Sequence, residues 1–290
     1  MRIGLQIPHF RPSTPETMRG WLKRTVQAVD SGGFDSLWVM DHFFQLGAWL
    51  GQPETEMIEG YSTLGFFAGL TEKVKIGLLV GGVIYRHPAQ VVKMVSTLDV
   101  LSGGRMYFGI GAAWYEHETE SLGMKFPSTR ERFERLEEML QIAKHMWSGD
   151  TSPYEGKHYA LPYPVNNPQP LSQPHPPIMI GGMGPKKTLR LVAQYADACN
   201  FFGRSEDALL QERLDILQEH CQQVGRPYEG IEKTVLQTAD FEGGTVQDVI
   251  ASGERLRNLG FEHVIFNIKG DYSQGALVAF RDEIIPALKG

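Results

Sequence analysis

Short apolar runs alternate along the chain with longer stretches in which apolar residues recur every three to four positions. The runs are bounded by glycine or polar turn residues, which is typical of buried strands, and the longer stretches have the periodicity of helices that pack on one face. Strands are expected at residues 3–7, 36–40, 74–80, 105–110, 178–181, 198–202, 234–237 and 263–267. Helices are expected at residues 16–30, 61–70, 88–101, 131–147, 186–195, 208–223, 245–259 and 276–288.

This alternation predicts an α/β fold of the closed (β/α)8 TIM-barrel class with insertion loops. A plain barrel of this kind needs about 250 residues, and the chain has 290. We expect one domain over residues 1–290, with a proline-rich loop at about 150–177 that has no regular structure and lies over one barrel end. A doubly wound sheet is less favoured, because the turn after the first strand, residues 8–12, lacks the glycines of dinucleotide-binding folds.

The charge balance argues against nucleic acids and anionic membranes as partners. The 28 basic and 34 acidic side chains give 28 − 34 = −6 at pH 7, so no basic surface for nucleic acid or anionic membranes is expected. No apolar run approaches the roughly 20 residues of a membrane span, and the chain begins with a strand pattern instead of a signal peptide. Two cysteines, Cys199 and Cys221, are too few for a disulfide framework. We expect a cytoplasmic protein.

Candidate chemistry is expected at the carboxyl ends of the strands, where barrels carry their sites. Asp41 and His42 follow the second expected strand and place a carboxylate beside an imidazole that titrates near neutral pH. The pair could perform acid–base chemistry, or Asp41 could cap the loop while His42 forms a simple hydrogen bond. No His-Glu-x-x-His sequence or nucleophile elbow occurs, so neither a metal site nor a serine hydrolase is predicted.

Glycine turns follow three further strands. The pair at residues 81–82 indicates close approach of the backbone to a ligand, or a sharp bend. Residues 109–111 imitate the start of a dinucleotide motif, but Trp114 stands where its third glycine belongs. The turn at residues 181–188 places free backbone N–H groups and a helix N-terminus beside two lysines, which predicts a phosphate cradle. An ordinary turn with solvated lysines is the alternative there.

In their order and spacing, several segments resemble the luciferase-like monooxygenase superfamily, and within it the oxidoreductases that use the deazaflavin coenzyme F420. The likeness covers almost the whole chain and includes Gly-Phe-Asp-Ser-Leu-Trp-Val-Met-Asp-His at residues 33–42 and Pro-Pro-Ile-Met-Ile-Gly-Gly at residues 176–182. The other segments are residues 2–5, 86–89, 101–105, 109–114, 146–149 and 195–200. The resemblance implies a bacterial-luciferase-like barrel that binds a flavin or deazaflavin at its carboxyl-terminal face.

The resemblance also implies roles for single residues. Asp41 and His42 would lie beside the cofactor ring as the catalytic pair, with His42 moving a proton and Asp41 orienting it or touching the polar edge of the ring. A non-prolyl cis peptide is expected between Leu79 and Val80. The cofactor would also contact Leu79, Val80, Gly81, Gly111, Gly181, Gly182 and Met183. Trp114 and Glu116 would face the substrate, while Trp49 could join an aromatic pocket there or belong to the loop core.

The chain departs from two branches of the superfamily after its fourth strand. The F420-dependent sugar-phosphate dehydrogenases carry a glutamate directly after the Gly-x-Gly, where this chain has Ala112, and the luciferases carry an arginine shortly after it. We expect hydride transfer between C5 of coenzyme F420 and a small organic substrate. The alternatives are a two-component monooxygenase that uses reduced FMN with a reductase partner, and a non-catalytic flavin-binding barrel. The resemblance further implies a homodimer.

Overall fold

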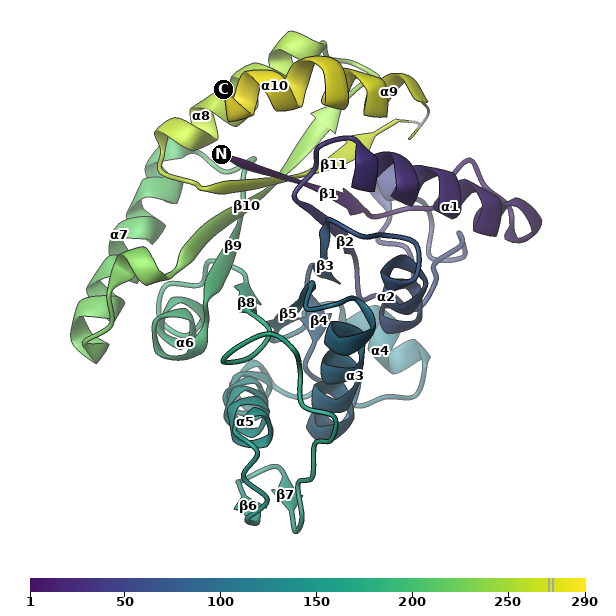
Figure 1. Ribbon diagram of the computed structural model, residues 1–290. Helices are drawn as coiled ribbons and strands as arrows, with labels where there is room; N and C mark the ends of the chain where they lie inside the picture. Colours follow the sequence, from purple (N-terminus) through teal and green to yellow (C-terminus); the bar gives the residue numbers. More distant parts are fainter. Residues whose placement is uncertain (271, 273) are drawn as a thin grey trace.

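Eight parallel strands close into a barrel in the computed structural model, which describes residues 1–270, 272 and 274–290 (Figure 1). The strands are β1 (Arg2–Ile7), β2 (Ser36–Val39), β3 (Lys75–Leu78), β5 (Met106–Gly111), β8 (Ile178–Gly181), β9 (Ala198–Phe202), β10 (Glu232–Asp240) and β11 (His263–Lys269). β1 lies between β2 and β11, and the barrel closes where Ile76 of β3 pairs with Met106 of β5. The predicted TIM barrel is therefore confirmed.

The strands form because runs of β-branched and large apolar residues are buried on both faces, as parallel strands covered by helices require. In β1, for example, Ile3, Leu5 and Ile7 are completely buried. β10 extends further than the expected 234–237, whereas β3 stops at Leu78 instead of residue 80. The peptide bond between Leu79 and Val80 is cis, in agreement with the resemblance. The two-residue β4 (Gly81–Gly82) follows it and pairs with β5.

The expected helices surround the barrel in the predicted order, and one short helix, α4, was not predicted (Figure 1). They are α1 (Pro15–Ser31), α2 (Gly60–Ala68), α3 (Pro88–Leu101), α4 (Glu116–Ser121), α5 (Thr129–Trp147), α6 (Thr188–Tyr195), α7 (Asp207–Val224) and α8 (Val246–Asn258), with short 3-10 turns η1 (Ala48–Leu50) and η2 (Tyr228–Gly230). The expected last helix is divided into α9 (Gln274–Ala279), a π-helical turn η3 (Phe280–Ile284) and α10 (Ile285–Lys289). The π turn ends two residues before Pro286, which lacks the N–H that a continuous helix would use. No helix in the described part of the chain is long and apolar enough to cross a bilayer.

The proline-rich insertion contains regular structure, so the expectation of an irregular loop was wrong. β6 (Tyr154–Glu155) and β7 (Ala160–Leu161) pair as a small antiparallel hairpin. Residues 154–161 contain no proline, and every backbone N–H in them can therefore take part in hydrogen bonds. The prolines fall on either side of the hairpin, where they restrict the chain to extended conformations.

The insertion also lies along the side of the barrel, against α3 and α5, rather than over one barrel end as expected. Lys157 Nζ is 2.7 Å from Glu134 Oε2 on α5. Further along, Asn166 Nδ2 donates to Ser96 Oγ on α3 at 3.0 Å. The insertion therefore packs on helices and leaves the carboxyl ends of the strands free for a site.

A buried polar network fills the amino-terminal end of the barrel. His263 Nδ1 is 2.7 Å from Glu232 Oε1, and His263 Nε2 is 2.8 Å from Ser36 Oγ. Trp38 Nε1 donates to the same Ser36 oxygen at 2.7 Å. The distances are those of a hydrolase triad, but Ser36 and His263 are each 1% exposed, so the group is a satisfied structural network.

Close contact between β3 and β5 depends on Gly109. A Cβ atom at this position would lie 1.9 Å from the Leu78 carbonyl oxygen. We expect Gly109→Ala to lower the free energy of unfolding by about 2 kcal/mol or more, because the backbone itself would have to move. The matched control is Gly230→Ala, where a Cβ atom would meet open space and the change should stay within about 0.5 kcal/mol. Urea unfolding of both variants measures this; equal stabilities would contradict the close-contact explanation.

Candidate active site

A cavity of about 570 Å³ opens among the carboxyl ends of the barrel strands. Most of the residues predicted for the site line it, namely Asp41, His42, Leu79, Val80, Gly81, Gly111, Gly181, Gly182 and Trp114. They follow β2, β3, β5 and β8, which are far apart in the sequence. The structure thus brings together in one cavity the segments selected from the sequence.

Three predicted residues do not line this cavity. Met183 is partly buried against the hydrophobic core, and Glu116 is exposed at the start of α4. Trp49 lines a separate depression of about 350 Å³, where its ring lies 5.8 Å from that of His9. Of the two tryptophans expected in an aromatic pocket, only Trp114 lines this cavity, where Tyr85, Phe133 and Phe202 supply the other phenyl and phenol rings.

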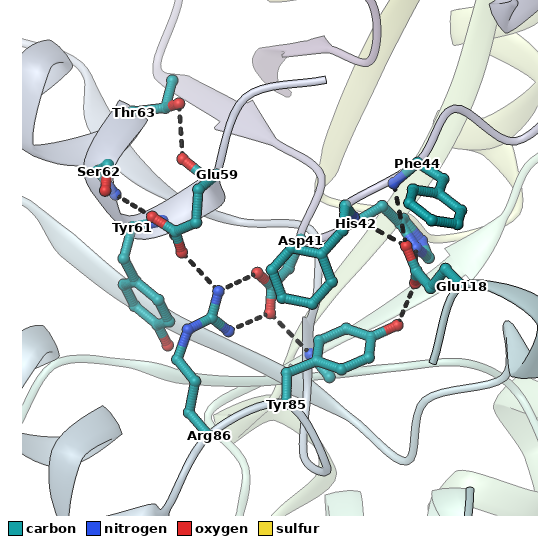
Figure 2. Close-up of polar contacts among 12 residues, drawn as sticks. Asp41, His42, Phe44, Glu59, Tyr61, Ser62, Thr63, Tyr85, Arg86 and Glu118 are labelled. Atoms are coloured by element: carbon teal, nitrogen blue, oxygen red, sulfur yellow. Dashed lines mark hydrogen bonds and ion pairs between the residues drawn. The ribbon is translucent and has the colours of Figure 1, made fainter. Parts of the chain in front are cut away.

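Asp41 forms a buried ion pair with Arg86. Arg86 Nη1 donates to Asp41 Oδ2 and Arg86 Nη2 to Asp41 Oδ1, both at 2.8 Å, and the Gly82 N–H donates to Asp41 Oδ2 at 3.0 Å (Figure 2). Asp41 is 2% exposed. No hydrogen bond between the Asp41 carboxylate and the His42 ring occurs, so the orienting role expected of Asp41 falls to another residue.

Glu59 completes the surroundings of Arg86. Its carboxylate pairs with Arg86 Nη2 and accepts the Tyr61 and Ser62 N–H groups at the start of α2, at 3.2 and 2.7 Å. Burial opposes the charge on Arg86, but Asp41 and Glu59 hold its pKa above the ordinary value. Two carboxylates therefore compensate this guanidinium, which is unavailable to an anionic ligand.

His42 is held by Glu118 from α4. His42 Nδ1 is 2.7 Å from Glu118 Oε1, and the Tyr85 hydroxyl donates to the same oxygen (Figure 2). The N–H groups of Phe43 and Phe44 donate to Glu118 Oε2 at 2.8 and 3.2 Å. Among the described residues, the His42 Nε2 atom has no hydrogen-bond partner. A carboxylate acceptor at Nδ1 places the proton of a neutral imidazole on that atom and leaves Nε2 as the free base.

Glu118 is charged despite being completely buried. Burial alone would raise its pKa, but the hydrogen bonds from His42, Tyr85 and Phe43 hold that pKa below its ordinary value of 4.5. Burial and the Glu118 contact raise the pKa of Tyr85, so its hydroxyl remains a protonated donor. Sequence reasoning missed Glu118, because Glu116 and Glu120 flank it in the same short helix and nothing in the spacing separates them.

The bulge after β3 forms one wall of the cavity. A Cβ atom at Gly111 would lie 3.0 Å from Val80 Cγ2, and one at Gly181 would lie 2.7 Å from it. The two glycines thus make room for the Val80 side chain. Gln6 Nε2 donates to the Leu79 carbonyl oxygen at 3.2 Å and fixes the bulge from β1.

Asn267 supplies a free polar atom on the same wall. Its Nδ2 donates to Gln6 Oε1 at 3.2 Å, and the residue lines the cavity. Its Oδ1 atom is buried and lacks a hydrogen-bond partner among the described residues. Buried acceptors are rarely left unpaired, so this atom is suited to a donor on a bound ligand.

Another wall carries a positive charge, that of Arg132, which no carboxylate contacts directly among the described residues. Arg132 and Thr129 of α5 line the cavity together with Thr188, the first residue of α6. Arg132 donates to the Ala113 carbonyl oxygen and to Thr129 Oγ1, both neutral acceptors, and its buried Nε atom has no partner in the described part of the chain. Burial lowers the pKa of Arg132. Two helix N-termini and an arginine therefore make this wall suitable for an anion.

The rest of the wall is mainly apolar, with Met40, Leu46, Leu50, Phe133, Leu136, Phe202 and Leu236. No group of three or more His, Cys, Asp or Glu side chains suited to a metal ion occurs among the residues the structure describes. The arrangement can therefore hold a largely apolar ring system with one anionic end, and can offer an imidazole for proton transfer.

Comparisons with known proteins agree with this arrangement. Residues 1–239 match the family described as luciferase-like monooxygenase. An F420-dependent glucose-6-phosphate dehydrogenase of Microbacterium testaceum is 26% identical over 310 aligned positions, which cover 89% of this chain and 90% of the relative. The oxygenase component of a flavin-dependent trigonelline monooxygenase of Acinetobacter baylyi is 24% identical, over 99% of this chain and 78% of the relative.

Solved structures show the same fold. An F420-dependent secondary alcohol dehydrogenase in complex with an F420–acetone adduct superposes with a TM-score of 0.84 at 19% identity, over 100% of this chain and 99% of that one. The match to the family covers most of the sequence, and the barrel fold is shared with this solved structure. This chain belongs to the luciferase-like monooxygenase family of flavin- or F420-dependent oxidoreductases.

Proposed function

We propose that the protein is a coenzyme F420-dependent oxidoreductase that transfers a hydride between C5 of the deazaflavin and a small, uncharged organic substrate. The observation that carries the proposal is the His42–Glu118 pair, with Nε2 free, in the same cavity as the glycine-lined bulge and the cationic wall. F420-dependent dehydrogenases are among the relatives in sequence and in structure, which supports this cofactor.

The residues of the cavity fit such a cofactor. Gly181 and Val80 form a wall that a flat ring can approach closely, and Asn267 Oδ1 offers a free acceptor for an N–H group at the ring edge. Arg132 and the N-terminus of α6 at Thr188 would hold the phosphate. When bound, the deazaflavin supplies the hydride acceptor or donor at C5.

His42 would move the proton that accompanies the hydride. Its Nε2 atom accepts a proton from a substrate hydroxyl during oxidation, or returns one to the oxygen during reduction, while Nδ1–H stays bonded to Glu118. The carboxylate stabilises the imidazolium that forms in the first case. Glu118 therefore acts as a positioning residue, and the apolar wall excludes water from the transfer.

The charges along the wall favour an uncharged substrate. Arg132 is the only guanidinium or ammonium group among the described residues that line the cavity, and the cofactor phosphate would use it. A phosphorylated sugar, the substrate named for the Microbacterium testaceum relative, needs a second cationic site. Ala112 also stands where those dehydrogenases carry a glutamate. A small alcohol or ketone fits these residues better.

The proposal is tested by titrating the purified protein with F420, FMN and FAD, each oxidised and reduced under nitrogen, while following cofactor fluorescence. We expect saturable binding of F420 with one site per chain and much weaker binding of both flavins. A preference for reduced FMN would overturn the proposal and indicate a two-component monooxygenase with a separate reductase. Failure of all three to bind would indicate a barrel without this activity.

Removing the imidazole should affect turnover more than binding. We expect His42→Ala to lower kcat for alcohol oxidation or ketone reduction by about 10²-fold, because proton transfer loses its base, while the Kd for F420 changes only a few-fold. Stopped-flow measurement of F420 absorbance in both variants gives the rates. Unchanged turnover would remove His42 from the mechanism.

The charge of Glu118 should be visible in the pH dependence of stability. Its folded-state pKa lies below the ordinary value of 4.5, so its contribution is present above that pH and is lost as the pH falls through the folded-state pKa. We expect Glu118→Gln to be less stable than wild type at pH 7, with a difference that shrinks below about pH 4.5. Urea unfolding across this range measures it, with exposed Glu120→Gln as control. A difference independent of pH would show that Glu118 acts without its charge.

A further inference from the structure

Two side chains donate to the same oxygen of the Glu118 carboxylate (Figure 2). Glu118 Oε1 accepts the Tyr85 hydroxyl and lies 2.7 Å from His42 Nδ1. The other oxygen, Oε2, accepts the N–H groups of Phe43 and Phe44. The two oxygens therefore have separate tasks, because Oε2 fixes the loop backbone whereas Oε1 connects a phenol to the imidazole.

The surrounding structure holds Tyr85 in this position. Its N–H donates to the Gly82 carbonyl oxygen at 3.1 Å, and its ring lies so close to Gly82 that a Cβ atom there would overlap it. The rings of Phe43 and Tyr85 pack edge to face, with their centres 5.2 Å apart. Tyr85 also lines the cavity. The phenol is thus fixed on Glu118 before any ligand enters.

The Tyr85 hydroxyl acts as a donor at every pH at which the protein would work. Burial and the Glu118 contact raise its pKa, so it keeps its proton. The positive end of the O–H dipole is then directed at the Glu118 oxygen that His42 also binds. A donor on a carboxylate oxygen takes up part of the negative charge that would otherwise stabilise a neighbouring cation, and this effect is strong where water is excluded. Tyr85 therefore makes the imidazolium form of His42 less favourable.

The carboxylate of Glu118 is the charge that acts most directly on His42. The titratable and charged groups around the imidazole are Asp41 and Arg86, Tyr85 from the turn after β4, Glu118 from α4, Arg132 from α5, and Tyr115 from the loop before α4. Asp41 and Arg86 neutralise each other, and a tyrosine phenol is uncharged near neutral pH. Among the described residues, Tyr85 is the only side chain other than His42 that binds the Glu118 carboxylate.

We propose that Tyr85 is a positioning residue that sets the base strength of His42 through the Glu118 oxygen that both side chains bind. With the hydroxyl in place, the imidazole gives up its second proton more readily, and Nε2 is more available as a base. Without the hydroxyl, the full charge of the carboxylate favours the imidazolium. The inference rests on the proposed function, because it concerns the group that moves the proton there.

The test measures kcat against pH for Tyr85→Phe with F420, in alcohol oxidation and in ketone reduction. We expect the midpoint of each pH profile to rise by about one unit, a tenfold change in proton affinity. Oxidation needs the free base, so it should be slower than in wild type around the midpoint. Reduction needs the imidazolium and should persist to higher pH. A purely structural defect would instead slow both directions at every pH.

Two further variants assign the effect to the shared oxygen. Tyr115→Phe removes the same hydroxyl from a ring whose centre lies 6.0 Å from that of His42 but which does not bind Glu118, so this control should keep the midpoint of the wild type. Tyr85→Phe added to Glu118→Gln should cause no additional change, because the effect of Tyr85 requires the carboxylate.

A second readout needs neither cofactor nor turnover. NMR of the histidine ring nitrogens in the ligand-free protein follows the protonation of His42, whose signals are identified by their loss in His42→Ala. An upward move of the NMR midpoint in Tyr85→Phe, in a protein that shows no F420 turnover, would confirm the coupling while the proposed function failed. An unchanged midpoint, or an equal move in Tyr115→Phe, would overturn the role of Tyr85 and leave the proposed function standing. A move that persists in the Glu118→Gln background would also overturn it, since the shared oxygen would then not be involved.

Discussion

The buried ion pair between Asp41 and Arg86 determines how the cavity is built. A charge that is removed from water must be matched by partners in good geometry, and here the Asp41 oxygens accept both arms of Arg86 and the Gly82 N–H. Arg86 in turn binds Glu59, which caps α2. The end of β2, the start of α2 and the turn before α3 must therefore meet at one point.

A second buried carboxylate, that of Glu118, connects the same segments to His42. His42 follows Asp41 in the chain and Tyr85 precedes Arg86, and both His42 and Tyr85 bind Glu118. The dipeptides Asp41-His42 and Tyr85-Arg86 are thus connected twice. Asp41 forms an ion pair with Arg86, and both His42 and Tyr85 bind the Glu118 carboxylate on α4. Of the donors to Glu118, the imidazole is the one with a second ring nitrogen, Nε2, that faces no partner among the described residues. The rigid surroundings leave one group free to exchange a proton.

The sequence predicted what is local and periodic. The eight strands follow from apolar runs between glycine turns, and the Asp41-His42 position follows from the rule that barrel sites lie at strand ends. The sequence did not distinguish Glu118 from Glu116, because their burial depends on how α4 packs against the β2 loop. The sequence also did not show that Trp114 lines the cavity whereas Trp49 does not, because a loop has no periodicity that indicates where a side chain points. The cis peptide bond between Leu79 and Val80 was predicted by the resemblance to the family, because no local feature of the sequence indicates it.

Positive charge that is available to a ligand is distributed unevenly around the cavity. Arg86 is not one of the described residues that line the cavity and is neutralised by two carboxylates, so it organises the wall through Asp41 without attracting an anion. Arg132 stands on the other wall with neutral acceptors only, and the exposed Lys186 and Lys187 follow outside. An anionic ligand with an apolar end would enter with its ring toward the apolar interior and its charge toward α5 and α6. His42 lines the same cavity and offers an uncharged co-substrate a hydrogen-bonding partner beside the mainly apolar wall.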